Sequence, residues 1–392
     1  AFFGPSKYGL LPELLPEKRL SWGNGIFQFG TTAAVITGTV IAGKLYELFK
    51  GQQQWSGVTL LGLSFVGLIF ASRITRVPAA NPDRRFRVNP FPDLSKSFAR
   101  IRGERSLFLA VMGESYFWML GALLQFCIAF YGKDLGLAES KISQLNGVLA
   151  GGIGLGCFLT GYLSGNKIEY GFVPLGVLGL STSILLIPAL QLDTFGSLAI
   201  CLGSVGFFGG FYLVPLAAII QQRPEPEIKG SIIALNSIIS FTGVFIASVI
   251  YYLCKKFLGF SLLDLFLLCG LMTLVMGAYI LRLLPDSLIR LVGFFVTRTI
   301  YRLNIVGRDN IPERGGALFV CNHLSFVDVL LLQASTDRPI RFIMYAGYMK
   351  QKVMGTFARI MKCIPISSES RPRDLIKSLK VASQAIRDGE VV

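Results

Sequence analysis

Histidine and charged residues are scarce in this sequence of 392 residues. It contains a single histidine, and Asp, Glu, Lys and Arg together make up only 16% of the chain. Soluble domains carry about 25% charged residues, so a purely soluble protein is excluded. The seven cysteines are too few for a disulfide scaffold and lack the spacing of metal ligands. We therefore expect no metal site.

Hydrophobic residues make up 52% of the chain, and the mean hydropathy is +0.58. Disordered chains are poor in such residues, so disorder is excluded as well. Roughly 20 apolar residues cross a bilayer as a helix, and residues 1–15 have the character of the end of one such span. Eight complete spans are predicted, at 24–45, 56–71, 107–131, 143–165, 172–190, 196–220, 232–253 and 260–283. The sequence thus predicts a multi-span α-helical membrane protein.

The charge is unevenly distributed. The charged fraction rises from about 13% before Leu284 to about 23% from Leu284 onward, an ordinary value for a soluble domain. We therefore expect a membrane domain at 1–284, an amphipathic helix or linker at 285–303 and a further domain at 304–392. Alternate loops between the predicted spans hold 15 and 6 Lys and Arg residues. The positive-inside rule places the richer set, together with the last domain, in the cytoplasm.

An internal repeat divides the membrane domain. The tripeptide Phe-Phe-Gly at 2–4 returns at 207–209, and each copy is followed by a Pro-Glu loop, a basic residue and an asparagine that opens the next span, Asn24 or Asn236. Repeats about 205 residues apart predict two parallel six-span halves, as in many transporters. Three spans of the first half would precede Ala1, so we expect that half to be truncated.

Polar residues inside spans are costly and indicate functional sites. Glu114 is the only acid deep in a predicted span, and for it substrate binding or proton coupling competes evenly with a structural role. The amides are more often used for hydrogen bonds between helices. The candidate transport residues are Glu114, Gln28, Asn24, Asn236 and Gln125. The glycine-rich stretch 147–165 lies within a span, so it predicts close helix packing and not a dinucleotide-binding loop.

The segment that follows the last span is apolar but interrupted by Arg290, Arg298 and Arg302. These charges are too frequent for a spanning helix. A helix that lies in the membrane interface fits better, because long arginine side chains can reach the lipid phosphates. The alternative is a linker without its own structure.

The single histidine, His323, lies between a predicted strand at 316–320 and a helix that begins near Val329. Ser325 and Asp328 have the spacing of a helix N-cap and its N3 partner. A strand–turn–helix arrangement would bring Asp328 to His323, where the carboxylate fixes the imidazole tautomer and the free nitrogen takes a proton from a hydroxyl. The alternative is a packing histidine beside a capping aspartate.

Two resemblances connect these patterns with known families. The segments FFGPSKYGLLPELLPE at 2–17, RLSWGNG at 19–25 and GYLSGNKIEYGFVPLG at 161–176 resemble the lysophospholipid transporter branch of the major facilitator superfamily. The motif NHLSFVD at 322–328, with VGRDNIP at 306–312, resembles the first motif of the glycerolipid acyltransferases. The second resemblance implies that His323, oriented by Asp328, deprotonates a glycerol hydroxyl that attacks an acyl thioester.

The acyltransferase resemblance also implies a phosphate-binding arginine in a second motif. Here Ser368 occupies that place, and Arg371 and Arg373 follow it; with Asn322 and Ser325 they are the candidate substrate-binding residues. A Pro-Glu-Gly third motif is absent. Residues 373–387 predict an amphipathic helix that Gly389 stops, and a strand begins at 391. We therefore expect an incomplete α/β acyltransferase domain.

Together the resemblances imply a lysophospholipid transporter of the bacterial inner membrane fused to a cytoplasmic acyltransferase. It would flip lysophospholipid inward and acylate it at the 2-position, with acyl-CoA or acyl carrier protein (ACP) thioester as co-substrate and no bound cofactor. Expected partners are membrane lipids and a downstream acyl-ligase domain, without nucleic acid. Two alternatives remain: a small-molecule exporter with a degenerate tail, and a lysophosphatidic acid acyltransferase with a membrane anchor.

Overall fold

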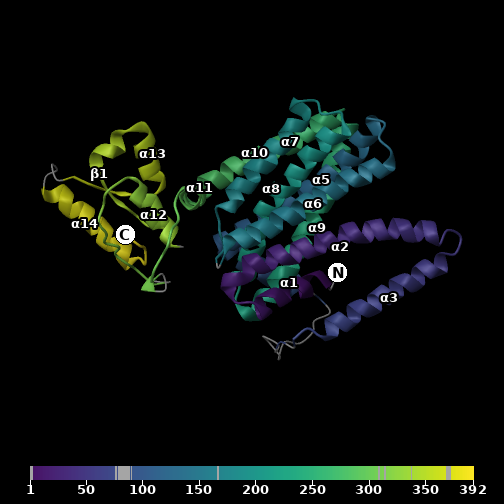
Figure 1. The fold of residues 1–392 in the computed structure, drawn as a ribbon, viewed down its shortest axis with the longest axis horizontal. Helices are drawn as coiled ribbons and strands as arrows, with labels where there is room; N and C mark the ends of the chain where they lie inside the picture. Colours follow the sequence, from purple (N-terminus) through teal and green to yellow (C-terminus); the bar gives the residue numbers. More distant parts are fainter. Residues whose placement is uncertain are drawn as a thin grey trace. The chain divides into compact units, whose positions relative to one another are not determined.

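The computed structural model describes residues 3–75, 77, 89, 91–165, 167–307, 310–312, 315–336, 338–367 and 372–392. The chain divides into two compact units, Ala1–Ile280 and Leu281–Val392. The first unit is helical and the second contains helices and short strands (Figure 1).

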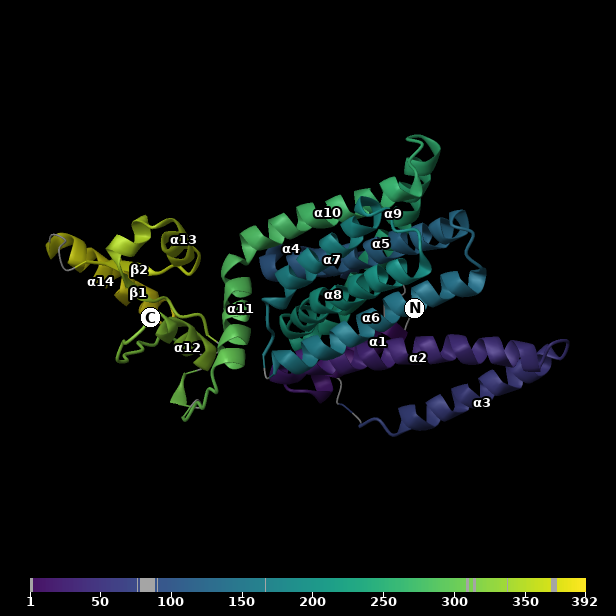
Figure 2. The ribbon, with the colours of Figure 1, turned by 45° about the horizontal axis from the view of Figure 1, so that its top comes forward.

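Long helices build the first unit (Figure 2). In chain order they are α1 (Phe3–Leu14), the 3₁₀ helix η1 (Glu17–Arg19), α2 (Leu20–Leu48), α3 (Gln53–Ser72), α4 (Phe91–Gly103), α5 (Arg105–Asp134), α6 (Glu139–Ser164), α7 (Phe172–Ala189), α8 (Phe195–Gln222), α9 (Pro226–Lys256) and α10 (Leu262–Leu283). The two copies of the sequence repeat form the helix pairs α1–α2 and α8–α9, each joined by a short connection that contains the Pro-Glu sequence.

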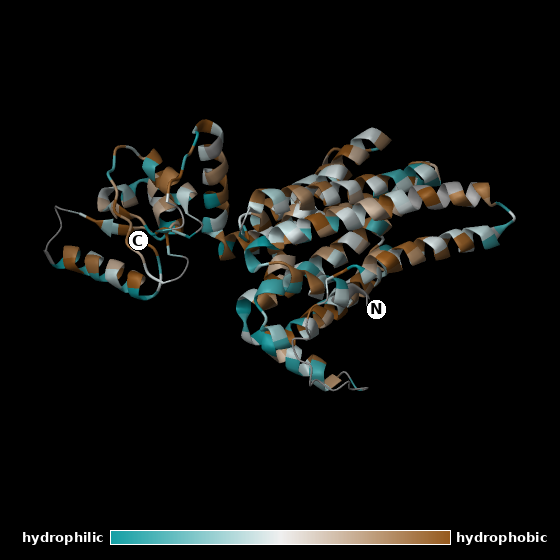
Figure 3. Ribbon diagram, turned by 60° about the horizontal axis from the view of Figure 1, so that its bottom comes forward, coloured by the Kyte–Doolittle hydropathy of each residue, from teal (hydrophilic) through white to brown (hydrophobic). Residues whose placement is uncertain are grey.

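Within the described residues, seven helices are long and apolar enough to cross a membrane, namely α3 and α5 to α10. They coincide with the last seven predicted spans, and hydrophobic residues run along them (Figure 3). The remaining predicted span, 24–45, lies in α2, where several side chains fall outside the described part of the chain. The prediction of a multi-pass membrane protein is confirmed.

Helix α4 corrects the sequence-based prediction, which placed only a basic loop between the second and third spans. Residues 91–103 form an amphipathic helix that buries Ser97 and Ile101. Arg100 of α4 pairs with Glu225, the residue before α9. The predicted loop thus contains a helix that packs against the bundle, because its apolar residues recur at helical spacing.

Close helix packing, predicted from the glycine-rich stretch, is confirmed in α6. A Cβ atom added to Gly156 would lie 2.0 Å from the carbonyl oxygen of Phe207 in α8. Conversely, a Cβ atom added to Gly210 of α8 would lie 2.3 Å from the backbone nitrogen of Cys157. Only glycine permits two helix backbones to come this close.

The second unit contains α11 (Pro285–Ile300), α12 (Val327–Ser335), β1 (Ile343–Tyr345), the 3₁₀ helix η3 (Ala346–Lys350), α13 (Lys352–Ile360), β2 (Ile364–Ile366) and α14 (Pro372–Arg387). Strands β1 and β2 are parallel, with Ile343 opposite Ile364. The segment 316–320, predicted as a strand, forms an isolated bridge between Ala317 and Val391, and the backbone N–H of Phe319 donates to the carbonyl of Val392 at 2.7 Å. The described part of this unit therefore has little strand.

Two sequence-based predictions in this unit concern helices. Residues 285–300 form helix α11, which buries Leu291 and packs near α12, since a Cβ atom added to Gly293 would lie 3.4 Å from Leu330. This packing favours a structured helix over a linker. Gly389 stops α14 as predicted, with φ +85° and the paired bonds of a Schellman motif: its N–H donates to Ile386 and that of Glu390 to Ala385.

Candidate functional site

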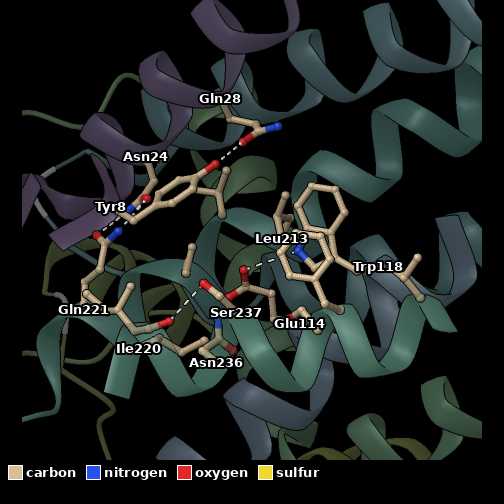
Figure 4. Close-up of a pocket in the computed structure, with 16 residues that line it drawn as sticks. Tyr8, Asn24, Gln28, Glu114, Trp118, Leu213, Ile220, Gln221, Asn236 and Ser237 are labelled. Atoms are coloured by element: carbon tan, nitrogen blue, oxygen red, sulfur yellow. Dashed lines mark hydrogen bonds between the residues drawn. The ribbon is translucent and has the colours of Figure 1, made fainter. Parts of the chain in front are cut away.

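A cavity of about 290 Å³ lies among α1, α2, α5, α8 and α9 (Figure 4). Four of the five candidate transport residues line it: Asn24, Gln28, Glu114 and Asn236. The other polar residues of its wall are Tyr8, Trp118, Gln221, Ser237 and Ser240, and the remainder is apolar: Leu213, Val214, Ala217, Ile220, Ile233, Phe241 and Val244. The cavity therefore offers both polar groups and hydrophobic surface to a ligand.

The amide side chains on one wall of the cavity are hydrogen-bonded to other side chains. Asn24 Nδ2 donates to Gln221 Oε1 at 2.7 Å, and Gln221 Nε2 donates to Asn24 Oδ1 at 3.1 Å. The hydroxyl of Tyr8 donates to Gln28 Oε1 at 3.2 Å. Asn24 and Gln28 thus make hydrogen bonds between helices, the structural role that the sequence left open for the amides.

The opposite wall, on α5 and α9, has unused hydrogen-bonding capacity. Trp118 Nε1 donates to Glu114 Oε1 across a long 3.5 Å. Among the described residues, Asn236 Oδ1 and Ser240 Oγ are buried and have no hydrogen-bond partner. Buried polar atoms are rarely left unpaired in proteins. This wall is therefore the part of the cavity best suited to receive a polar ligand group.

Gln125, the fifth candidate transport residue, does not line the cavity, and its side chain is exposed. It follows Glu114 by 11 positions on α5, which keeps it on the same helix face but about 16 Å further along the axis. Gln125 is therefore not part of this cavity wall, and its role in transport stays a prediction. The candidates from the sequence do not include Ser237 and Ser240, although Ser240 lies one helical turn after Asn236 and that spacing places both on one helix face.

In the second unit, His323 and Asp328 meet as the sequence predicted. His323 Nδ1 lies 3.0 Å from Asp328 Oδ2. The same carboxylate oxygen accepts the backbone N–H groups of Leu324 at 2.7 Å and Ser325 at 2.8 Å. Asp328 occupies the first turn of α12, so the turn before the helix brings the histidine back to it.

The electrostatics of this pair are set mainly by the backbone. The N–H groups of Ser325 and Leu324, followed by His323, lower the pKa of Asp328 below its usual value of 3.8. The carboxylate is therefore ionised near neutral pH and holds a proton on Nδ1, so that Nε2 of the exposed imidazole can accept one. This arrangement can perform general base catalysis on a hydroxyl.

The predicted capping box is only half present. Asp328 accepts the N–H of Ser325, but the hydroxyl of Ser325 accepts from Val327 N at 3.3 Å and not from Asp328 N, which donates to the carbonyl of Ser325. The reason is that α12 begins at Val327, so Ser325 lies two residues before the helix.

The other candidate substrate-binding residues are less defined. Asn322 is exposed beside His323, and Arg373 is exposed in the first turn of α14. Arg371 and Ser368 lie outside the described residues. The structure therefore brings together His323, Asp328 and Ser325, while no described contact connects Arg373 with them.

Comparisons with known proteins agree with both units. The family model of the Major Facilitator Superfamily matches residues 1–248, and the acyltransferase model matches residues 302–392. The lysophospholipid transporter LplT of Klebsiella pneumoniae (strain 342) is 29% identical over 248 residues, which are 61% of this chain and 59% of that protein. LplT of Enterobacter sp. (strain 638) is 27% identical over 266 residues, which are 65% of this chain and 64% of that protein.

The chain thus spans roughly 60% of the length of these relatives. The matched part lies in the first unit of the chain. The matches to the family models cover both units, with the first match ending in α9 and the second beginning after α11. The chain belongs to the major facilitator superfamily and joins an acyltransferase region to that fold.

Proposed function

We propose that the first unit moves lysophospholipids across the bacterial inner membrane and that the second unit acylates them. The amphipathic cavity is the observation that carries the transport proposal. A lysophospholipid has one polar headgroup and one acyl chain, and the cavity combines Glu114 and Asn236 with apolar residues such as Phe241. The name of the LplT relatives supports the same substrate class.

The contact between His323 and Asp328 supports the acyl-transfer proposal. Nε2 of His323 removes the proton from the 2-hydroxyl of the lysophospholipid while its oxygen attacks the thioester carbonyl. The C–S bond then breaks, an ester bond forms, and the thiolate takes up the proton. General bases of this kind contribute about 10²–10⁴-fold to the rate.

The acyl donor in this proposal is acyl-CoA or acyl-ACP, used as a co-substrate. Asn322, Ser325, Arg371 and Arg373 are proposed to contact the substrate near the His–Asp pair. A downstream acyl-ligase domain would supply the donor. The distribution of basic residues favours a cytoplasmic position for the second unit, and tethering it to the transporter raises the local concentration of its substrate.

Proteoliposomes that contain the chain test the acyl-transfer proposal. They receive lysophosphatidylethanolamine and an acyl thioester, and the diacyl product is measured for the wild type and for His323→Ala. We expect product from the wild type and a loss of at least about 100-fold in the variant. Equal product from both would contradict the role of His323. If only lysophosphatidic acid gives product, the alternative of a lysophosphatidic acid acyltransferase with a membrane anchor is favoured.

A separate assay without acyl donor tests transport. Labelled lysophosphatidylethanolamine is added to the outer leaflet, and the fraction that albumin can no longer extract is followed over time. Protein-dependent protection supports the proposal. Protection equal to that of empty liposomes would overturn it and would favour an exporter of other molecules.

A further inference from the structure

The cavity wall contains two buried polar side chains of helix α9. Asn236 is 7% exposed and Ser240 is 8% exposed, and both side chains line the cavity from α9, one helical turn apart. Asn236 Oδ1 and Ser240 Oγ have no hydrogen-bond partner among the described residues. Leaving such atoms unpaired costs free energy unless a ligand supplies the partner.

The neighbouring polar groups do not share this property. Asn24 and Gln221 satisfy each other, and Gln28 accepts from Tyr8. Ser237, adjacent to Asn236, donates its hydroxyl to the carbonyl of Ile233 at 3.1 Å. Within the described cavity wall, the buried polar atoms without a hydrogen-bond partner thus lie on one turn of α9.

We propose that Asn236 and Ser240 form a subsite for the free glycerol hydroxyl of a lysophospholipid. This inference rests on the proposed transport function and names the group by which the cavity distinguishes its substrate. A hydroxyl can donate to an amide oxygen and accept from a serine hydroxyl at the same time. The ester that replaces it in a diacyl phospholipid can only accept, so it leaves one buried atom unpaired.

The surroundings of the pair fit this occupant. Ile233, Phe241 and Val244 line the cavity from the same helix and offer apolar contact to the glycerol backbone and the start of the acyl chain. Glu114 lies beside Asn236 on the polar wall. A site that hydrogen-bonds a substrate hydroxyl discriminates strongly against the analogue that lacks it, because its own polar groups then stay unpaired.

The test compares two lipids in the albumin-protection assay without acyl donor. One is lysophosphatidylethanolamine, and the other is its 2-deoxy analogue, in which hydrogen replaces the glycerol hydroxyl. We expect the wild type to move the lysolipid at least about tenfold faster than the analogue. In Ser240→Ala and in Asn236→Leu the preference should fall to within about threefold. Ser237→Ala is the matched control and should keep the preference, because that hydroxyl is already bonded to its own helix.

The outcomes separate the two proposals. A wild type that moves both lipids equally fast overturns the hydroxyl subsite while transport stands. A wild type that moves neither lipid overturns the transport function and the subsite with it. A preference that persists in Ser240→Ala and in Asn236→Leu also overturns the subsite, and the use of two variants keeps the test decisive if one of them fails to fold.

Discussion

The side chains of Asn24 and Gln221, 197 positions apart in the chain, exchange two hydrogen bonds inside the membrane domain. Asn24 belongs to α2, in the first copy of the sequence repeat, and Gln221 lies in the last turn of α8, in the second. Both are almost fully buried, at 4% and 2% exposure. These hydrogen bonds therefore connect the two copies of the repeat beside the cavity.

Breaking this pair should destabilise the protein. In Asn24→Leu the buried amide of Gln221 loses its partner, so we expect the free energy of unfolding to fall by about 1–3 kcal/mol. The midpoint of thermal unfolding in detergent measures the change. The double variant Asn24→Leu/Gln221→Leu should lose less than the sum of the single variants. Gln125→Leu, at an exposed position of α5, is the control and should change little; full additivity would contradict the coupling.

Removal of the cavity carboxylate should impair transport alone. Glu114→Gln keeps the size of the side chain but replaces the carboxyl group by an amide, and the loss of a hydrogen bond to the substrate corresponds to a decrease of about 10-fold in lysolipid uptake. Acyl transfer measured in mixed micelles, where no transport is needed, should be unchanged. Uptake at the wild-type rate would show that Glu114 does not bind the substrate.

Asp328→Asn should lower acyl transfer without unfolding the second unit. The asparagine oxygen can still accept the N–H groups of Leu324 and Ser325, but it carries no charge to hold the proton on Nδ1 of His323. We expect the rate to fall about 10²–10⁴-fold, with lysolipid uptake retained. If the variant acylates at the wild-type rate, the charge of Asp328 does not position His323.

The lowered pKa of Asp328 also predicts a dependence of stability on acid. Because the pKa is lower in the folded than in the unfolded chain, the ionised carboxylate stabilises the fold above the usual value of 3.8. This contribution is lost as the pH falls from that value through the folded-state pKa. Chemical unfolding of the wild type and of Asp328→Asn, compared at neutral and acidic pH, should show a difference that shrinks only in this acidic range.

The contact between α6 and α8 should tolerate no side chain. Gly156→Ala places a Cβ atom against the backbone of Phe207, so the helices must separate, and overpacking of this kind costs about 1–3 kcal/mol or more. Gly147→Ala, on the same helix with open space around it, is the matched control. The yield of monodisperse protein in size-exclusion chromatography measures the effect. Equal yields of the two variants would contradict the close packing.

The sequence alone located the spans that were compared with the structure, because a helix needs roughly 20 mainly apolar residues to cross a bilayer and such a run is visible in the sequence. It also predicted the contact of His323 with Asp328 and the end of α14 at Gly389, since turns and helix ends depend on neighbours within a few residues. The catalytic use of His323 and Asp328 stays a prediction.

Only the tertiary structure decided which polar residues share the cavity. Asn24 finds Gln221, Ser240 is left without a partner, and Gln125 lies outside, although all of them are polar residues within helices. A one-dimensional pattern gives the face of a helix but not the level along its axis at which neighbouring helices meet. That level is set by the packing of backbones such as Gly156 against Phe207, and it determines which side chains face each other.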